Sequence, residues 1–144
     1  MDEKFCRLLN ADRCSLFIVD EAEKELWTRV AVGVDDTIRL PMTNAGLTGE
    51  ALTAASVLNV SDCDAHPKFN KSVDQQTGFK TEALIACPVR NCDGEVVAVV
   101  EAIQGTPHSK WRAGSKGFTS REQDLLQLLA GHVAVFIDHL DASE

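Results

Sequence analysis

A single carboxylate interrupts the most apolar stretch of the chain. Glu101 directly follows the run Val96–Val100, and Ala102 and Ile103 continue the apolar pattern after it. A strand with two apolar faces is expected to be buried on both sides, where an unpaired carboxylate costs several kcal/mol. Glu101 therefore either lies where the strand emerges, bonded to a backbone amide or an arginine, or faces a ligand cavity.

The connection Asn59–Thr81 places polar side chains between aromatic ones. Its polar members, beside Phe69 and Phe79, are Asp62, Asp64, Asn70, Asp74, Thr77 and Thr81. Donors and acceptors interleaved with aromatic rings on a long loop suit a planar polar ligand. The simpler interpretation is a solvated loop anchored by two phenylalanines, and the residue types alone favour it.

Cysteine and histidine offer a third kind of chemistry. Cys63 and His66 have the C-x₂-H spacing of half a zinc site, but no second pair has ligand spacing. Nothing specific supports a Cys–His nucleophile. His132 and His139 fall on the last predicted helix, and we assign them to its surface or to an interface.

The chain has an odd number of cysteines, without the spacing of a disulfide framework, which indicates reduced thiols in a cytosolic protein. They are Cys6, Cys14, Cys63, Cys87 and Cys92.

The expected strands and helices predict an α+β fold, which is α/β only in the loose sense. Tight turns between successive strands favour an antiparallel sheet with helices on its faces. Asp93-Gly94, between the last two expected strands, is a hairpin signal. The expected strands are Cys14–Val19, Glu25–Val32, Thr37–Leu40, Val57–Val60, Ala83–Val89 and Glu95–Ile103. The expected helices are Phe5–Leu9, Gly46–Ala55, a short one beginning at Pro67 with Asp64 as cap, and a long one after Thr119. That last helix begins with a capping box, Thr119-Ser120-Arg121-Glu122. Its apolar stripe is Leu125, Leu129, Val133, Phe136 and Leu140.

Size and charge exclude several classes of protein. The 144 residues suffice for one domain. The net charge of −8 argues against nucleic acid and anionic membranes as partners. The longest apolar run is too short to span a membrane, and the acidic start lacks the features of a signal peptide.

A long motif adds a family resemblance. The segments that carry it are Leu58-Asn59-Val60-Ser61-Asp62, His66-Pro67-Lys68-Phe69-Asn70, Val73-Asp74-Gln75-Gln76-Thr77-Gly78-Phe79-Lys80-Thr81 and Cys87-Pro88-Val89. Together they resemble the GAF domains of cyclic-nucleotide phosphodiesterases. Asp12–Phe17 resembles the first strand of those domains, and Gly46-Leu47-Thr48-Gly49 resembles their helix start. The resemblance implies that residues 1–144 form one GAF domain of a larger multidomain protein, with about six antiparallel strands flanked by helices.

The resemblance also implies a binding site for a cyclic nucleotide under the connection Asn59–Thr81. The contacts it implies are Ser15, Ala31, Val32, Thr48, Asn70, Asp74, Thr77, Thr81 and Glu101. Helix N-terminal amides near Thr48 and Phe69 would hold the phosphate. The family often has an acid where Val32 stands, and adenine needs no acid, so we expect cAMP in preference to cGMP. Asp74 or Glu101 could turn toward a guanine base, so cGMP stays an alternative ligand.

One family signature is altered in this chain. Family members have Asn-Lys, a spacer, a phenylalanine and then Asp-Glu, whereas here Gln104-Gly105, Phe118 and Glu122-Gln123 occupy those places. The family's Lys–Asp bridge therefore cannot form in the same way. This keeps two alternatives open: a ligand-free dimerisation module, and a thiol-dependent reductase of free methionine sulfoxide that recruits Cys63, Cys87 or Cys92.

The role that we expect is regulatory rather than enzymatic. The chain has no metal-binding motif of the phosphodiesterase catalytic class, so we expect no catalytic residue, no metal and no cofactor besides the cyclic-nucleotide ligand. We expect the domain to be an allosteric sensor, a dimerisation module or both, in a cytoplasmic phosphodiesterase. Its expected partners are a second copy, through the terminal helices, and the catalytic domain of the parent chain.

Overall fold

The computed structural model describes residues 3–29, 37–42, 45–69, 80–106 and 117–142. The elements are, in chain order, α1 (Glu3–Leu9), β1 (Arg13–Asp20), β2 (Glu25–Arg29), β3 (Thr37–Pro41), α2 (Gly46–Ala54), β4 (Leu58–Val60), the 3₁₀ turn η2 (Cys63–Ala65), β5 (Lys80–Arg90), β6 (Val96–Thr106) and α4 (Ser120–Ala142).

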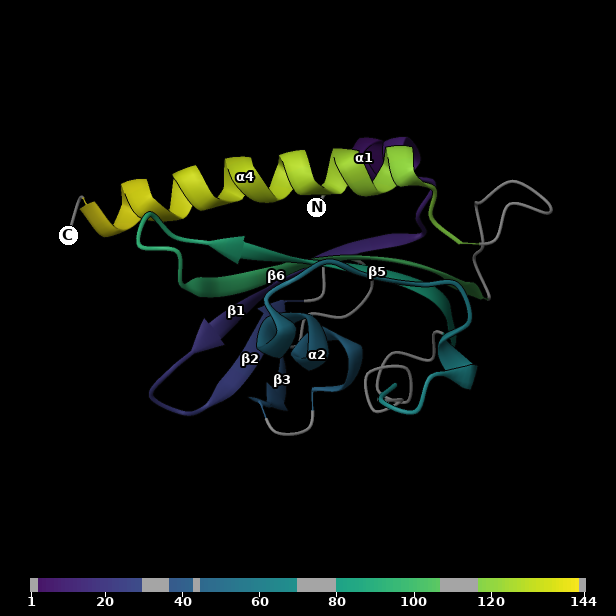
Figure 1. The fold of residues 1–144 in the computed structure, drawn as a ribbon, viewed down its shortest axis with the longest axis horizontal. Coiled ribbons are helices and arrows are strands. Elements are labelled where there is room, and N and C mark those ends of the chain that lie inside the picture. The colour runs from purple at the N-terminus through teal and green to yellow at the C-terminus, as the bar shows by residue number, and fades with distance from the viewer. Residues whose placement is uncertain (1–2, 30–36, 43–44, 70–79, 107–116, 143–144) are drawn as a thin grey trace.

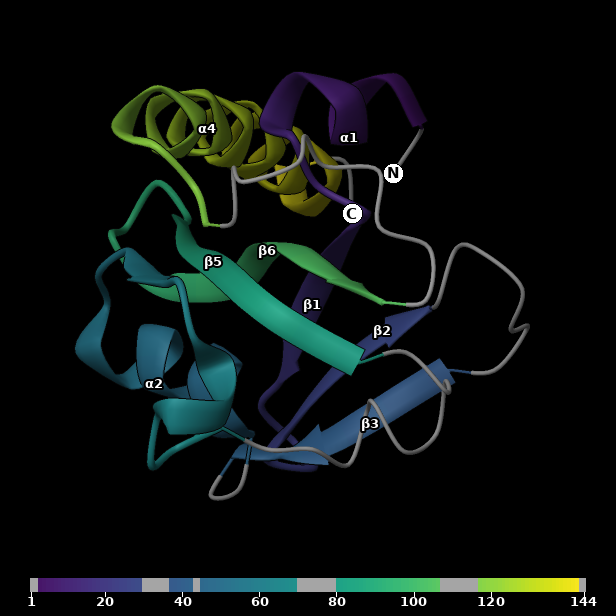
Figure 2. The same cartoon turned by 90° about the vertical axis from the view of Figure 1, so that its right-hand side faces the viewer.

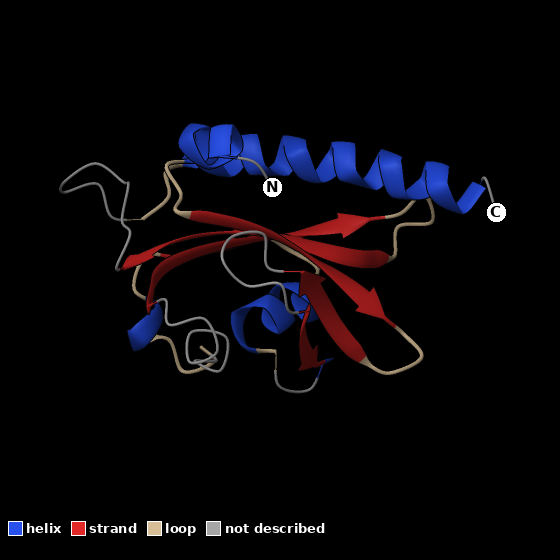
Figure 3. Cartoon of the chain, turned by 180° about the vertical axis from the view of Figure 1, so that it is seen from behind, coloured by secondary structure: helices blue, strands red, loops and turns tan. Residues whose placement is uncertain are grey.

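The strands form one six-stranded sheet in the order β3-β2-β1-β6-β5-β4. Every described pair of neighbouring strands is antiparallel. Helices α1 and α4 cover one face, and α2 lies against the other (Figures 1 and 3). The predicted α+β class, with about six antiparallel strands flanked by helices, is therefore confirmed.

Two apolar clusters fill the space on the two faces of the sheet. Alternation along β5 sends Ala83 and Ile85 into the cluster under α4, and Leu84 and Ala86 into the cluster under α2. In β6, Val99 and Val100 divide in the same way, and both are fully buried. The central strands are thus buried on both sides, as their apolar runs predict.

The two local signals at helix and hairpin ends are confirmed. Thr119 Oγ1 accepts from the Glu122 N–H at 3.3 Å, and Glu122 Oε1 accepts from the Thr119 N–H at 2.9 Å, which makes a complete capping box. Between β5 and β6, Gly94 has a φ of 84° and its N–H donates to the Asn91 carbonyl at 3.0 Å. Glycine supplies this left-handed conformation at little cost.

The predicted short helix beginning at Pro67 is wrong. The structure has a 3₁₀ turn at Cys63–Ala65, which ends before the proline. His66 is extended, with φ −87° and ψ 127°, because the proline ring disfavours the helical conformation of the residue before it. Asp64 lies inside this turn and is not its N-cap; Asp62 has that place, without a side-chain capping bond.

The predicted stripe of α4 is only partly correct. Leu125, Leu129 and Val133 pack against the cluster under the helix. Phe136 is 63% exposed, and its neighbour Ile137 packs inward instead. Leu126 and Ala130, four residues apart, are buried against the sheet. The buried face of the helix therefore includes Ile137 in place of the predicted Phe136. The Leu140 side chain lies outside the described residues.

Several boundaries also differ from those expected. Both long strands exceed their predictions, since β5 begins at Lys80 and β6 continues to Thr106. Strand β2 is described to Arg29, and the rest of its predicted range lies outside the described residues.

Of the helices in the described part of the chain, none combines the length and apolar character that a membrane crossing requires.

Candidate functional site

Glu101 is a buried carboxylate in the middle of β6. Its side chain is 8% exposed, and the Thr48 hydroxyl donates a hydrogen bond to its Oε2. The first sequence interpretation, in which Glu101 lies where the strand emerges and bonds an amide or an arginine, is therefore wrong about its place. The strand continues five residues beyond it, to Thr106. The Thr48 hydroxyl supplies part of the pairing that burial of a carboxylate demands.

The start of α2 brings Thr48 to Glu101. Gly46, at the first position of the helix, has a φ of 61°. A Cβ on Gly49 would lie 2.9 Å from the Ala45 Cβ, so only glycine fits there without a shift. Leu47 and Ala51 then pack into the cluster under α2, and Thr48, 5% exposed, lies against the sheet.

Ser15 joins this pair through the register of the sheet. In the β1–β6 ladder Ser15 is directly opposite Glu101, and in the β5–β6 ladder Ala86 is the residue opposite. Opposite residues of antiparallel strands share a face, with Cβ atoms about 4.5–5.5 Å apart. Ala86 belongs to the cluster under α2, so Ser15 and Glu101 face the α2 side. We call Ser15, Thr48 and Glu101 the polar triplet.

Thr81 reaches the same face because of a β-bulge. Thr81 is opposite Gly105, whereas Ala83 is opposite Gln104, so Glu82 is an extra residue in β5. Without the bulge, Thr81 would share the α4 side with Ala83. With it, Thr81 shares the face of Gly105 and Glu101 and is 4% exposed. Gly105 is four residues from Glu101, which puts Thr81 about 13 Å from the triplet along the strand direction.

The other implied contacts lie outside the described residues. These are Ala31, Val32, Asn70, Asp74 and Thr77. The start of the connection that holds three of them is anchored on α2. Phe69 packs against the cluster under α2, and Lys68 Nζ is 2.9 Å from Glu50 Oε2. Lys80, where the chain re-enters the sheet, is 3.8 Å from Asp64.

Gln104 is a buried polar residue whose role the sequence analysis did not recognise. Its side chain is fully buried, and its Nε2 donates to the Asn10 and Gly117 carbonyls at 2.9 and 3.0 Å. Its Oε1 accepts from the Gly117 N–H at 2.7 Å. Beside it, the Gly105 N–H donates to Asp12 Oδ2 at 2.8 Å. The hydrogen bonds of Gln104 and Gly105 thus join β6 to the segments that precede β1 and α4. The only sequence signal was the departure from the Asn-Lys signature.

The three cysteines considered for a reductase do not form one site. Cys63 is fully buried in η2 on the α2 side, whereas Cys87 is in the cluster under α4. Burial raises the pKa of the Cys87 thiol to about 11. Cys92 is exposed in the β5–β6 turn, where the nearby Asp138 and then Asp93 raise its pKa.

The half zinc site is not completed by described residues. The His66 N–H donates to the Cys63 carbonyl at 3.0 Å, and His66 Nδ1 accepts from the Lys68 N–H at 3.1 Å. Across the parts of the chain that the structure describes, no three His, Cys, Asp or Glu side chains gather in a metal-binding arrangement.

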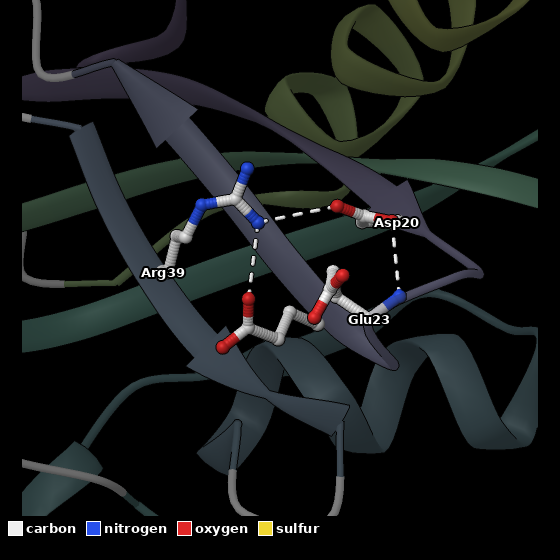
Figure 4. Close-up of polar contacts among 4 residues, drawn as sticks. Asp20, Glu23 and Arg39 are labelled. Carbon is white, nitrogen blue, oxygen red and sulfur yellow. Dashed lines mark hydrogen bonds and ion pairs between the residues drawn. The ribbon is translucent and has the colours of Figure 1, made fainter.

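An exposed charged cluster joins β3 to the ends of β1 and β2. Arg39 Nη1 is 3.2 Å from Asp20 Oδ2 and 3.0 Å from Glu25 Oε1, while Asp20 Oδ1 accepts from the Glu23 N–H at 3.2 Å (Figure 4). The donation from Glu23, followed by that from Arg39, lowers the pKa of Asp20. This cluster ties β3 to the β1–β2 turn and has a structural role.

Comparison with solved structures finds the same fold in proteins of different function. The GAF domain of a phosphoenolpyruvate-protein phosphotransferase from Coxiella burnetii is 25% identical, with a TM-score of 0.79, over 97% of this chain and 79% of that one. A type II free methionine-R-sulfoxide reductase from Thermoplasma acidophilum is 18% identical, with a TM-score of 0.68, over 90% of this chain and 81% of that one.

Comparison with curated proteins finds a phosphodiesterase. The dual 3',5'-cyclic-AMP and -GMP phosphodiesterase 11A of Takifugu rubripes is 28% identical over 85% of this chain. The match spans only 14% of the length of that enzyme. The family model of the GAF domain matches residues 3–137. By this match over nearly its whole length, the chain belongs to the GAF domain family.

Proposed function

We propose that this domain binds a cyclic nucleotide on the α2 side of its sheet, and cAMP in preference to cGMP. The observation that carries the proposal is the buried hydrogen bond from Thr48 to Glu101, with Ser15 opposite Glu101 in the sheet. Three polar side chains from β1, α2 and β6 lie on the α2 side of the sheet, beside the apolar cluster there. Such convergent polar groups in an apolar setting are typical of small-molecule sites.

The chemistry of the triplet suits the donor groups of a nucleotide. Glu101 is an acceptor, and the Thr48 hydroxyl, which donates a hydrogen bond to Glu101, keeps lone pairs that accept. A ribose hydroxyl supplies a matching donor. The first N–H groups of α2 have no acceptor within the helix and sit at the positive end of its dipole. They would receive the phosphate, which explains how a domain of net charge −8 binds an anion.

The preference for adenine rests on which acids are available to a base. Guanine presents N1 and N2 donors that favour a carboxylate, and Val32 offers none. Glu101 accepts from Thr48 and is therefore less able to turn toward a base. Backbone groups satisfy the N6 amine and N1 of adenine without an acid. Asp74 remains the acid on which a guanine site would depend.

The curated relative supports the setting that we propose for the domain. That relative is a phosphodiesterase of cAMP and cGMP. We accordingly place this chain as a regulatory, non-catalytic domain of a cytoplasmic cyclic-nucleotide phosphodiesterase, in which ligand occupancy is passed to a catalytic domain of the parent chain.

Equilibrium titration of the chain with cAMP and with cGMP tests the proposal. A ligand that binds only the folded state stabilises it, by about 2.7 kcal/mol at a hundred times its Kd. We expect 1:1 binding and a rise in melting temperature with cAMP, and a smaller rise with cGMP. Absence of any rise with either nucleotide at millimolar concentration would refute binding. Displacement of bound cAMP by an equal or lower concentration of cGMP would reverse the preference.

Exposed apolar side chains on the helices favour dimerisation as a second role. Leu128 and Val135, seven residues apart on α4, are 62% and 70% exposed, and Phe136 and Leu8 are 63% and 64% exposed. Residues seven apart lie on one side of a helix. We propose that the exposed strip formed by Leu128, Val135 and Phe136 on α4 pairs with a second copy of the chain. Sedimentation velocity should give a dimer that Val135→Asp dissociates and Gln127→Glu, elsewhere on α4, does not. A monomer at all concentrations would contradict this role.

A further inference from the structure

Two thiols are in contact on the α4 side of the sheet, on the face opposite the polar triplet. Cys6 Sγ and Cys14 Sγ are joined by a hydrogen bond at a distance of 3.6 Å. Cys14 is 6% exposed within the cluster under α4, and Cys6 is half-buried against it. Neither sulfur is in a disulfide. The pair is separate from the residues of the proposed nucleotide site.

The backbone fixes the approach of the two sulfurs. Helix α1 ends with Asn10 at a φ of 55°. The Ala11 N–H donates to the Cys6 carbonyl at 2.8 Å, and the Asn10 N–H donates to the Arg7 carbonyl at 3.2 Å. These two bonds form a Schellman motif, which reverses the chain. Cys6 provides the carbonyl of the longer bond, so the turn itself places Cys6 over the strand that follows.

Backbone pairing also fixes the position of Cys14 in β1. The Asp12 N–H donates to the Ile103 carbonyl at 2.8 Å, and Cys14 is opposite Ala102 in the β1–β6 ladder. Figure 2 shows α1 beside α4 and above β1. The two sulfurs are therefore held in contact by ordered backbone on both sides, at 3.6 Å, compared with the 2.05 Å of a disulfide bond.

We propose that Cys6 and Cys14 are a reversible redox modification site, oxidised to a disulfide by a low-molecular-weight disulfide such as oxidised glutathione. A reducing cytosol keeps such pairs as thiols, and oxidation makes the bond transient and regulatory. The bond would fix α1 to β1 and to the surface that α1 shares with the start of α4.

The exchange has two steps. In the first, Cys6 loses its proton to solvent, and its thiolate attacks one sulfur of oxidised glutathione. The glutathione S–S bond breaks, and one glutathione thiolate leaves and takes up a proton. In the second, Cys14 loses its proton and attacks the Cys6 sulfur of the mixed disulfide, which releases the second glutathione. Two protein thiols are oxidised by two electrons, and one oxidised glutathione is reduced to two thiols.

The environment of each sulfur sets this order. The hydrogen bond between the two thiols and then burial raise the pKa of the Cys14 thiol, so Cys14 is the poorer first nucleophile. Cys6 is the more exposed of the two. Cys14 forms the second bond because the mixed disulfide at Cys6 brings the target sulfur to it.

The test uses the full chain in glutathione buffers of increasing oxidised fraction, followed by alkylation and non-reducing peptide mass spectrometry. Trypsin cuts after Lys4, Arg7, Arg13 and Lys24, so the two cysteines fall in separate peptides, Phe5–Arg7 and Cys14–Lys24. We expect these peptides to be joined, at a mass two hydrogens below their sum, and to separate on reduction. The proposal is overturned if Cys6 carries only glutathione while Cys14 is alkylated, or if either cysteine is joined to Cys92.

Matched variants separate the modification from a change in folding. Cys6→Ser should abolish the joined peptides, whereas Cys92→Ser, which removes an exposed thiol, should leave them unchanged. Both variants are first checked for a wild-type melting temperature under reducing conditions. Oxidation should also slow hydrogen exchange of the α1 amides in wild type and in Cys92→Ser, but not in Cys6→Ser. Equal exchange in the oxidised and reduced wild type would refute the fixing of α1.

Discussion

The side-chain amide of Gln104 bonds the backbone of Gly117 in both directions. Its Nε2 donates to the Gly117 carbonyl at 3.0 Å, and its Oε1 accepts from the Gly117 N–H at 2.7 Å. Gly117 has a φ of 97°, and a Cβ added to it would lie 3.2 Å from the Ser61 Cβ. Gln104 thereby fixes the segment before α4 against the residue that follows β4.

A neutral side chain makes this connection. A buried ion pair must recover the desolvation of two charges, whereas an amide that satisfies three backbone groups does not. The third group is the Asn10 carbonyl at the end of α1, 2.9 Å from Nε2. Gln104 therefore joins β6 to the ends of both helices on the α4 side, and the altered signature does not leave these segments unconnected.

The first prediction is that Gln104→Leu destabilises the domain strongly. The substitution removes three hydrogen bonds to backbone groups, and each buried group left unsatisfied costs about 1–3 kcal/mol. Because water will reach some of them, we expect a loss of about 2–4 kcal/mol in the free energy of unfolding, measured with urea. Gln127→Leu, which changes an exposed glutamine on α4, is the control and should stay within about 0.5 kcal/mol of wild type. A Gln104→Leu domain as stable as the control would show that the three bonds contribute nothing.

The parts of this fold that the sequence predicts correctly are those set by neighbours along the chain. Asp93-Gly94 specifies a turn by the conformation that glycine permits, and Thr119 and Glu122 specify a helix start by bonding each other's backbone. The central burial of β5 and β6 follows from their apolar runs. In each case the physical cause lies within a few residues, so it is visible without the fold.

The parts that could not be predicted depend on contacts between distant segments. Thr48 and Glu101 are 53 residues apart, and only the packing of α2 on the sheet brings them together. The bulge at Glu82 turns Thr81 to the α2 side, and nothing local announces it because a bulge is a property of two strands in register. Without the family resemblance, Glu101 was recognisable as unusual, but its threonine partner was not.

The second prediction concerns the pH dependence of the Asp20 cluster. The pKa of Asp20 is lowered in the folded state, so its contribution to stability is complete above the ordinary carboxyl pKa and is lost as the pH falls through the lowered value. Arg39→Gln should raise the pKa of Asp20 but not restore it fully, because the Glu23 N–H still donates to Oδ1. Carboxyl-carbon NMR titration measures the shift. Lys24→Gln removes a nearby charge that pairs with Glu21 instead and should change Asp20 much less; equal shifts in both variants would contradict the role of Arg39.

The third prediction compares two glycines that lie in helices. Gly49→Ala should destabilise the start of α2, because the new Cβ would lie 2.9 Å from the Ala45 Cβ. Gly131→Ala should stabilise α4 by about 0.5–1 kcal/mol, because its Cβ meets nothing within 4 Å and alanine is the better helix former. Thermal melting of the two variants should therefore shift in opposite directions. A rise in melting temperature for both would mean that Ala45 moves aside at no cost.

The fourth prediction is that Thr48→Val and Glu101→Gln each weaken binding of cAMP. Valine keeps the shape of threonine but removes the hydroxyl, which leaves Glu101 without one hydrogen bond in a layer where it is 8% exposed. Glutamine keeps the size of Glu101 but replaces one acceptor oxygen by a donor. Each change should reduce affinity by about 1–3 kcal/mol, the cost of a buried polar group left unsatisfied. Calorimetric titration with cAMP measures the loss.

Thr53→Val is the matched control, since Thr53 is on the same helix but exposed. It should bind cAMP as wild type does, because the exchange of threonine for valine then changes only the solvated side of α2. The double variant Thr48→Val/Glu101→Gln should lose less than the sum of the single losses, because the two residues share one hydrogen bond. If Thr48→Val lowers the melting temperature and leaves the Kd for cAMP unchanged, the Thr48–Glu101 pair stabilises the fold alone, and the ligand lies elsewhere.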